Sequence, residues 1–349
     1  MKTILFFAPY PNAENIKDGF FQRIKNIDNE FLDYNRIYLK IFFRFGHNKE
    51  EIYKSEKLST YKLHFFKSFS LIKNIIKENK IVYVHSILNF FPGCLFLSKK
   101  HLISLDFHGI VPEELKYSNN TRLSFFYSKV EKKAMSMVKN IIVVTKSMEK
   151  FINNKYPKNT VNFIYHPIIT RNTLIQNNQK ENIKDDKIVF VYSGNCQKWQ
   201  RVDDVLYFIK NHDSDNYKYI ILTLDVNIIN INIKNIIGIE HKSEIIVKSV
   251  QPNELFNYYE IADYGFLIRD DHPLNRVANP TKMLEYLYYG LNIIGDLYEI
   301  GDYRDYDFLK FNDENLKLRK GKSKKNANLA KNILNQNVEK LVDKVIFND

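Results

Sequence analysis

The sequence is poor in cysteine, in glycine-rich motifs and in long apolar runs, and each shortage excludes a class of protein. Cys94 and Cys196 are too few for a disulfide framework and wrongly spaced for a zinc site, which fits a reducing cytosol. No internal repeat, low-complexity tract or GxGxxG dinucleotide fingerprint is present. No apolar run approaches the roughly 20 residues that a helix needs to cross a bilayer. The composition therefore indicates a globular protein that is soluble or peripheral to a membrane.

The N-terminal segment MKTILFFAPYPN lacks a small-residue cleavage site, and prolines interrupt its short apolar run. It therefore predicts a first strand and not a signal peptide. The chain has 349 residues, of which 44% are hydrophobic, enough to bury the cores of two ordinary domains.

Acidic residues are scarce in the first half of the chain. Residues 1–170 hold 27 Lys and Arg against 14 Asp and Glu, whereas residues 171–349 hold 25 against 26. A one-sided positive field attracts polyanions, either nucleic acid or the anionic cytoplasmic leaflet of a membrane. An AT-rich genome, which encodes many Lys residues, would produce the same excess, so charge alone does not choose a partner.

What the sequence does contain is an alternation of short β-rich runs with helix-length polar segments. Such runs, bounded by Gly, Pro, Asp or Ser, are typical of parallel sheets covered on both faces, so the predicted class is α/β. Residues 168–187 lose the apolar period and predict a linker. We expect two doubly wound domains, 1–170 and 171–326, and a C-terminal helix in 327–349 that packs back on the first domain. The predicted strands are TILFFAPY, NRIYLKIF, KIVYVHS, LISLDFHG, NIIVVT, VNFIYHP, KIVFVYSG, KYIILTLD, EIIVKSV, YGFLI and LNIIGD.

Ligands of open α/β sheets bind beyond the carboxyl ends of strands, so residues that follow the predicted strands are the site candidates. In the first domain, Gly19 could let the backbone approach a phosphate or sugar, with a plain turn as the alternative. His108, in LDFHGIVPEE, could donate to a sugar hydroxyl or stabilise developing charge. The alternative is a histidine held by local backbone groups. Glu113 and Glu114 are interpreted as first-turn residues that complement a helix dipole.

In the second domain, YSGNCQKWQRVDDVL places Gly194, Lys198 and Arg201 between a strand and a helix. The two cations could hold a diphosphate, with help from the helix amides. Trp199, the single tryptophan, is interpreted either as a ligand contact or as a packing residue between domains.

A second helix start follows the strand YGFLI, in the segment ANPTKMLEY. Asn279 is suited to capping this helix, and Pro280 to its first position. The amides of Thr281 and Lys282 would then be left for an anion. Glu285, on the same face, could accept both hydroxyls of a ribose beside that anion. An ordinary surface pair between Lys282 and Glu285 is the alternative.

Together these segments resemble a known family. The order HG after a mid-chain strand, G-x-x-x-K-W-Q-x-x-D-D, then I-A-D-Y-G-F-L-I-R and N-P-T-K-x-x-E-Y-L-x-x-G is similar to bacterial retaining glycosyltransferases of family 4. The similarity covers nearly the whole chain and is greatest to members from surface polysaccharide gene clusters. It implies a GT-B fold, with two Rossmann-like domains facing a central cleft. The second domain would hold a nucleotide-sugar such as a UDP- or GDP-sugar, the first an acceptor, with no metal or other cofactor required.

The resemblance also implies roles for single residues. Glu285 becomes the ribose ligand, Arg201 and Lys282 the diphosphate ligands, and His108 the residue beside the donor sugar, near the reacting carbon. Two positions depart from the family pattern. Val277 stands where a second Glu often contacts the donor sugar, and Asn195 where many members have a phosphate-binding Arg. The neighbouring polar groups that could substitute are Asn275, Arg276 and Asn279.

The expected reaction is hexosyl transfer to a glycan or lipid-linked acceptor, in capsule, O-antigen or lipopolysaccharide assembly. Fixed cations and helix amides that stabilise the leaving diphosphate would remove the need for a metal. Asp213-Ser214-Asp215 matches the Asp-x-Asp metal clamp of the other glycosyltransferase fold, but its polar surroundings predict a solvated loop. Because no carboxylate base is evident near His108, we expect retention of anomeric configuration.

Three rival functions stay open at this point. A sugar-nucleotide epimerase can share the fold. A nucleic-acid-binding protein would need exposed aromatics interleaved with Lys and Arg, whereas most Tyr and Phe fall in predicted cores, so we expect no nucleic acid partner. A catalytically inactive binding module is the third, given Val277.

The predicted place of work is the cytoplasm, at the inner face of the cytoplasmic membrane. The stretch KSFSLIKNIIKENK, residues 67–80, has the spacing of a basic amphipathic helix that could dock on anionic lipid. A helix packed on the sheet would have the same spacing. The apolar residues concerned are Phe69, Leu71, Ile72, Ile75 and Ile76.

Overall fold

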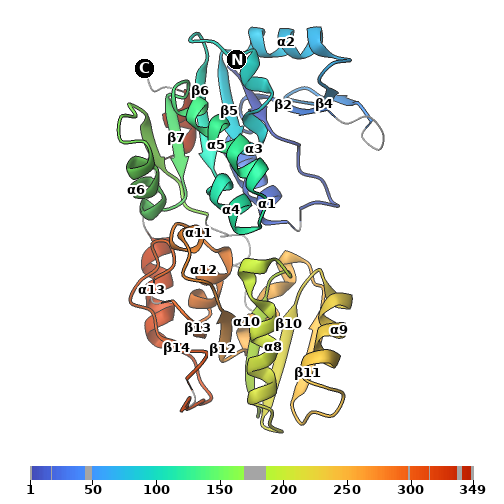
Figure 1. Ribbon diagram of the computed structural model, residues 1–349, viewed down its shortest axis with the longest axis vertical. Helices are drawn as coiled ribbons and strands as arrows, with labels where there is room; N and C mark the ends of the chain where they lie inside the picture. The colour runs from blue at the N-terminus through green and yellow to red at the C-terminus, as the bar shows by residue number, and fades with distance from the viewer. Residues whose placement is uncertain are drawn as a thin grey trace. The chain divides into compact units, whose positions relative to one another are not determined.

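The chain folds into two compact units. The computed structural model describes residues 2–16, 18–43, 49–168, 186–297, 299–313, 315–335 and 340–346 (Figure 1). The first unit comprises Met1–Pro167 together with Val338–Asp349, and the second comprises Ile168–Asn337. Most of the expected linker, residues 169–185, lies outside the described residues.

The first unit is built on a mainly parallel sheet. In the described residues its strand order is β3-β4-β2-β1-β5-β6-β7-β8, and β3 pairs with β4 in the antiparallel sense. The strands are β1 (Thr3–Phe7), β2 (Asn35–Phe42), β3 (Glu51–Lys54), β4 (Leu58–His64), β5 (Ile81–His85), β6 (Leu102–Phe107), β7 (Asn140–Val143) and β8 (Asn162–Tyr165).

Both faces of this sheet are covered, because successive residues of a strand point to opposite sides. On one face, Phe6 of β1 packs in a cluster with α1 (Gly19–Glu30) and α14 (Leu341–Ile346), which is red in Figure 1 and lies beside β7. On the opposite face, Phe7 lies against Gly93 of the 3-10 turn η1 (Gly93–Leu95). The other helices are α2 (Phe69–Glu78), α3 (Ile87–Phe90), α4 (Val111–Tyr117), α5 (Thr121–Met135) and α6 (Lys146–Lys155).

Helix α2 corrects one expectation from the sequence. Ile72, Ile75 and Ile76 are buried in the first unit, so they belong to its core and are not available to a membrane. At the start of the same helix, Phe69 and Leu71 are exposed. The interpretation of α2 as a helix packed on the sheet is therefore right for its isoleucines.

The second unit has a parallel sheet whose order, over the described residues, is β11-β10-β9-β12-β13-β14. Alternate residues of β9 separate its two cores: Val189 and Val191 pack with α10, α12 and α13, whereas Phe190 and Tyr192 pack with α8 and α9. The strands are β9 (Ile188–Ser193), β10 (Tyr217–Leu222), β11 (Glu244–Lys248), β12 (Tyr264–Leu267), β13 (Asn292–Gly295) and β14 (Phe308–Lys310). The helices are η2 (Lys198–Gln200), α8 (Val202–Asn211), α9 (Val226–Ile236), η3 (Pro252–Glu254), α10 (Leu255–Ile261), α11 (Pro273–Arg276), α12 (Thr281–Tyr288) and α13 (Lys324–Leu334).

Each sheet reverses its winding direction next to its first strand. In the first unit β1 lies between β2 and β5, and in the second β9 lies between β10 and β12. At such a switch point the loops leave the carboxyl ends of neighbouring strands in opposite directions, which opens a crevice for a ligand. The α/β class predicted from the sequence is thus confirmed, and it directs attention to the loops after β1, β5, β9 and β12. Over the described ranges, no helix combines the length and apolar character that a membrane span requires.

Candidate functional site

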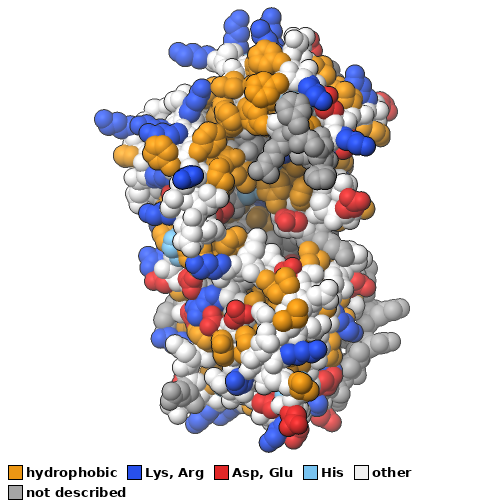
Figure 2. All heavy atoms as spheres, turned by 45° about the vertical axis from the view of Figure 1, so that its right-hand side comes forward, with side chains coloured by type: hydrophobic (Ala, Val, Ile, Leu, Met, Phe, Trp, Pro, Cys, Tyr) orange, Lys and Arg blue, Asp and Glu red, His pale blue; other side chains and the backbone are white. Residues whose placement is uncertain are grey.

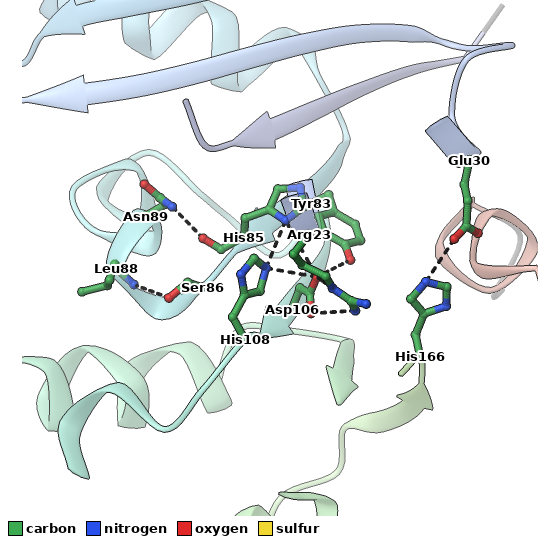
Figure 3. Close-up of polar contacts among 10 residues, drawn as sticks. All are labelled: Arg23, Glu30, Tyr83, His85, Ser86, Leu88, Asn89, Asp106, His108 and His166. Carbon is green, nitrogen blue, oxygen red and sulfur yellow. Dashed lines mark hydrogen bonds and ion pairs between the residues drawn. The ribbon is translucent and has the colours of Figure 1, made fainter. Parts of the chain in front are cut away.

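A buried carboxylate, Asp106, organises the carboxyl-end edge of the first sheet (Figure 3). Arg23 of α1 donates from Nε to Oδ2 at 3.1 Å and from Nη2 to Oδ1 at 3.2 Å. Tyr83 of β5 donates its hydroxyl to Oδ2 at 2.9 Å. His108, directly after β6, places Nε2 3.3 Å from the same oxygen. Elements that are distant in the sequence therefore converge on one side chain.

Asp106 is ionised although it is fully buried. Burial by itself would raise the pKa of this carboxyl, but Arg23 and then His108 outweigh burial and hold the pKa well below its usual range. Arg23 is buried as well. The Arg23–Asp106 pair is therefore a fixed element of the core, and its carboxylate positions His108.

A second histidine, His85, lies at the end of β5 and places Nδ1 3.2 Å from Nε2 of His108. Burial and then His108 lower the pKa of His85 well below its usual value, so His85 is neutral at pH 7. In the described part of the chain, Nδ1 of His108 and Nε2 of His85 are buried atoms without a hydrogen-bond partner. Buried polar atoms are ordinarily paired, so an unpaired one marks a place where a ligand can supply the partner. His108 is the accessible member, with 12% of its side chain exposed.

The same three residues have the composition of a metal site. One ligand atom each from His85, Asp106 and His108 lies within 4.8 Å of the others. Arg23 opposes this use, because its guanidinium Nε is 3.1 Å from Asp106 and would repel a divalent cation. The arrangement suits the positioning of His108 better than the binding of a metal.

The Asp-x-Asp letters at 213–215 lie elsewhere, in a turn of the second unit. Asp213 accepts hydrogen bonds from the backbone N–H of Lys242 at 2.9 Å and of Ser243 at 2.8 Å. Its carboxylate therefore holds two loops together, as expected for a structural aspartate.

Glu114 of α4 is a candidate that the sequence interpretation missed. Its Oε1 occupies the space that a side chain at position 109 would need, so the carboxyl lies against Gly109, the residue after His108. Burial and then Glu113 raise the pKa of Glu114 to about 7. A carboxyl with this pKa exchanges a proton at neutral pH. The absence of a carboxylate near His108, which was the sequence argument for retention, therefore does not hold.

The raised pKa of Glu114 predicts a pH-dependent stability. The folded state favours the protonated carboxyl, so the stabilisation present below the unfolded-state pKa of 4.5 is lost as the pH rises through about 7. We expect Glu114→Gln to gain about 1–2 kcal/mol relative to the parent protein between about pH 5 and about pH 8. This is less than full burial would give, because Glu114 is partly exposed. Urea unfolding across this range measures it, with exposed Glu78→Gln as control, and parallel curves for parent and variant would contradict it.

In the second unit, Arg269 is a buried cation just beyond β12, at the switch point of the sheet. Its Nη1 donates to the backbone carbonyl of Trp199, in the loop after β9, at 3.0 Å. Burial lowers its pKa, and the neighbouring groups that oppose this are the hydroxyls of Tyr192 and Tyr286. Within the described residues, no carboxylate forms an ion pair with Arg269. Because a buried charge is stable only with a partner, this guanidinium is a place for an anion.

Lys282 and Glu285 of α12 belong to the same edge of the sheet. Tyr286, which lies beside Arg269, accepts a hydrogen bond from the backbone N–H of Ser193 at 2.9 Å. Lys282 precedes Tyr286 by four residues and so lies on the same face of the helix. Its Nζ is 2.9 Å from Oε2 of Glu285, which is only 2% exposed. The Lys282–Glu285 pair exists, as the alternative interpretation expected, but its carboxylate is buried and not on the surface.

The start of α12 differs from the prediction. The helix begins at Thr281, so Pro280 is the residue before the helix and not its first residue. Asn279 does not cap the helix, because its Oδ1 accepts a hydrogen bond from the hydroxyl of Tyr303 at 3.0 Å. The helix therefore has no side-chain cap, so no capping side chain occupies the first backbone N–H groups of α12. These groups can donate hydrogen bonds to a bound ligand.

Arg201 has surroundings that oppose the binding of a diphosphate. Its Nε is 2.7 Å from Asp204, its Nη1 is 3.3 Å from Asp270, and Nη1 also bonds to Asp296. Three carboxylates around one guanidinium leave a net negative charge, which repels a further anion. The structure therefore favours a role for Arg201 in joining the start of α8 to the loops that contain Asp270 and Asp296.

The two glycines predicted as site residues, Gly19 and Gly194, differ in how much space surrounds them. Gly19 begins α1 after Asp18, whose carboxylate accepts from the N–H of Phe20 at 2.7 Å, and a Cβ there would meet no described atom within 4 Å. Gly194 follows β9, and a Cβ there would lie 2.7 Å from the hydroxyl of Tyr192. Packing therefore requires glycine at 194, whereas the space at Gly19 is open.

The remaining predicted residues are distributed over two loops. Lys198 begins η2, next to the carbonyl that Arg269 binds. Asn275 is buried and donates to the carbonyl of Asp270 at 2.9 Å, whereas exposed Arg276 forms a two-point pair with Asp271. In the described structure, the hydrogen bonds of these two side chains go to Asp270 and Asp271 and not to Arg269.

Comparison with known proteins adds to this geometry. No family model and no curated protein sequence matches the chain. Solved structures are similar over most of its length. HepE of Anabaena, in complex with UDP and glucose, is 12% identical with a TM-score of 0.58, over 96% of this chain and 90% of that one. WaaG, a glycosyltransferase involved in lipopolysaccharide biosynthesis, is 12% identical with a TM-score of 0.58, over 84% and 80%. Sucrose-phosphate synthase from Thermosynechococcus elongatus is 10% identical with a TM-score of 0.57, over 84% and 81%.

The chain has the GT-B fold. This confirms the fold that the motif resemblance implied, although the identities are too low to show more than the fold. Each GT-B unit here has a group of polar side chains at or next to the switch point of its own sheet: around Asp106 of β6, beside β5, in the first unit, and around Arg269, after β12, in the second. His108, Lys282 and Glu285 were predicted from the sequence, whereas Arg269 and the group of Arg23, Tyr83 and His85 around Asp106 were not. One signal was available, because polar residues alternate in YVH and LDFH at the ends of two otherwise apolar strands.

Proposed function

We propose that this protein is a glycosyltransferase that moves a sugar from a nucleotide-sugar to a glycan or lipid-linked glycan acceptor. The observation that carries the proposal is Arg269, a buried cation with no carboxylate partner in the described residues, at the switch point of a GT-B second unit. The similar structures support the donor class, since HepE was solved with UDP and glucose. WaaG supports a role in the assembly of surface polysaccharide, such as lipopolysaccharide, O-antigen or capsule, at the cytoplasmic membrane face.

In this proposal the second unit holds the donor nucleotide. Arg269 and Lys282 bind the diphosphate, together with the first amides of α12, which have no partner inside the helix. Glu285 accepts the ribose hydroxyls when Lys282 turns from its carboxylate to the phosphate. Arg269 thereby replaces Arg201 as the arginine of the site, and it supplies the cation that Asn195 does not.

The chemical step follows from where charge develops. Departure of the nucleoside diphosphate leaves negative charge on its phosphate, and fixed cations aimed there lower the barrier, so the proposal needs no metal. In the first unit, the partly exposed ring of His108 contacts the donor sugar and stabilises the charge that develops near the reacting carbon. We propose retention of the anomeric configuration because the sequence motifs resemble those of retaining glycosyltransferases. The anomeric configuration of the product, read by NMR, decides it.

Calorimetric titration with UDP and GDP tests the donor site. We expect Arg269→Gln to weaken nucleotide binding about ten- to a hundredfold, since charge-assisted hydrogen bonds are lost. Arg201→Gln should have a smaller effect, because its three carboxylates already repel the diphosphate. Glu285→Gln should lose affinity for nucleotides but not for inorganic diphosphate.

Exposed Arg304→Gln, in the same unit, is the matched control, and thermal melting checks that each variant folds. A larger loss with Arg201→Gln than with Arg269→Gln would return the diphosphate role to Arg201. If neither UDP, GDP nor any nucleotide-sugar binds the parent protein, the proposed function is wrong. Release of nucleoside diphosphate from a panel of UDP-, GDP- and dTDP-sugars, with and without a lipid-linked acceptor, then separates transfer from epimerisation.

A further inference from the structure

The first unit carries a surface of exposed phenylalanine rings that its core does not require. We call this surface the aromatic ridge: its exposed members are Phe43, Phe66, Phe69 and Phe126, and the half-buried rings of Phe91 and Phe96 connect them. Figure 2 shows hydrophobic side chains gathered on the upper part of the molecule, which is the first unit, with Lys and Arg around them. Phe66 is the most exposed member, at 66%. Exposed apolar patches of this kind on a folded protein ordinarily mark a binding surface.

The rings form a connected set and are not isolated on the surface. The ring of Phe43 lies 6.1 Å from that of Phe66 and 5.7 Å from that of Phe91, which in turn lies 5.2 Å from Phe126. Buried Phe65 lies beneath, 5.1 Å from Phe66 and 5.7 Å from Phe69. Phe43 follows β2, Phe65 and Phe66 lie in the turn between β4 and α2, and Phe69 begins α2. Phe91 follows α3, and Phe126 is in α5. The ridge therefore packs on a ring that belongs to the core, while its outer rings remain exposed.

Helix α5, which contributes Phe126 to the ridge, has exposed basic side chains and no exposed acidic one. The acidic residue of α5, Glu131, is buried and paired with Lys155 at 2.6 Å. The ammonium of Lys129 lies 5.1 Å from the ring of the exposed Phe125. The exposed cations of α5 are Arg122, Lys129, Lys132 and Lys133. Apolar rings with cations beside them match the interface of an anionic bilayer, where rings enter the acyl region and cations bind the headgroups.

We propose that the aromatic ridge inserts into the surface of an anionic lipid bilayer and thereby docks the first unit on the membrane. Exposed leucines near the ridge favour lipid over nucleic acid, because Leu71, Leu95 and Leu123 cannot stack on bases. The proposal deepens the proposed function, since a membrane-docked first unit meets a lipid-linked acceptor. From the sequence, we expected the isoleucines of α2 to contact the membrane, but they are buried. In the present proposal the phenylalanines of the ridge make that contact instead.

Vesicle co-sedimentation tests this docking. Vesicles of phosphatidylcholine alone are compared with equal parts phosphatidylcholine and phosphatidylglycerol, at about 0.1 M and about 0.5 M salt. We expect the parent protein to prefer anionic vesicles and Phe66→Ser with Phe69→Ser to lose about tenfold or more in affinity at both salt concentrations. Ile231→Ser with Ile239→Ser removes exposed apolar side chains from the second unit and should bind as the parent does. Thermal melting confirms that both double variants fold.

Insertion, and not charge alone, is measured with Phe66→Trp. Its fluorescence should shift to the blue on anionic vesicles and be quenched by brominated acyl chains, relative to the parent with Trp199. Equal binding of both vesicle types, binding to neither, or unchanged binding by the Phe66→Ser, Phe69→Ser variant would overturn the proposal. Tighter Phe66-dependent binding to single-stranded oligonucleotide than to vesicles would assign the ridge to nucleic acid instead. Nucleotide titration of the same double variant keeps this outcome separate from a failure of the donor site.

Discussion

Replacing Asp106 with alanine is expected to lower the free energy of unfolding by about 3–5 kcal/mol. The reason is the charge left behind, because Arg23 is 2% exposed and forms both of its ion-pair hydrogen bonds with this carboxylate. Tyr83 would also lose the acceptor for its buried hydroxyl. A buried guanidinium without its anion can neither reach water nor give up its proton. Urea unfolding of the parent protein and the variant measures the difference.

A double variant distinguishes the lost pair from lost packing. Arg23→Met with Asp106→Leu removes both charges together, so it should recover most of the stability that Asp106→Ala loses. An Asp106→Ala protein within about 1 kcal/mol of the parent would show that the pair is not buried in solution. A double variant as unstable as Asp106→Ala would instead assign the loss to the cavity.

Replacing His108 with alanine is expected to lower the turnover number by about a hundredfold or more while nucleotide affinity changes little. His108 lies in the first unit and is held by Asp106 and His85, whereas the proposed diphosphate ligands are all in the second unit. Its loss would therefore remove an interaction made with the reacting sugar and leave the nucleotide site complete. Steady-state kinetics measures the turnover number with the donor that the nucleotide-sugar panel identifies. Calorimetry measures the affinity for the nucleotide of that donor.

The matched control is His101→Ala, because His101 is in the same unit and bonds to backbone carbonyls away from the cluster. It should change neither the turnover number nor the nucleotide affinity. If His108→Ala weakens nucleotide binding and leaves turnover intact, His108 is a residue of donor binding and not of the chemical step. Unfolding of His108→Ala at the temperature of the assay is excluded by melting both variants.

The sequence was sufficient for the elements that lie in the centre of each sheet. A strand buried on both faces is a continuous apolar run, so β1, β5, β9 and β12 could be predicted together with the loops that follow them. Strand β3 was missed because it is short and all four of its residues are exposed, so its two apolar residues, Ile52 and Tyr53, neither alternate with polar ones nor form a longer run. The order of strands, and with it the switch points, depends on which strands pair, and no local pattern in the sequence encodes that.

The candidate site could be predicted only where its residues are close in the sequence. Lys282 and Glu285 are three residues apart on one helix, so their pairing was visible. Arg23 and Asp106 are 83 residues apart, and two of the three carboxylates around Arg201, those of Asp270 and Asp296, come from loops far along the chain. The sequence did not show that three carboxylates surround Arg201. We therefore interpreted Arg201 as a diphosphate ligand, whereas its surroundings in the structure oppose an anion.

The packing of α14 has a consequence for how the protein is made. Leu341, Val342, Val345 and Ile346 complete the buried cluster of the first unit around Phe6, yet the ribosome adds them after the whole second unit. The part of the sheet face that α14 covers is therefore exposed for most of synthesis, although α1 already packs beside it, and the second unit can fold while the first is unfinished. We expect nascent chains of this protein to expose the apolar residues that α14 covers until α14 itself has been made.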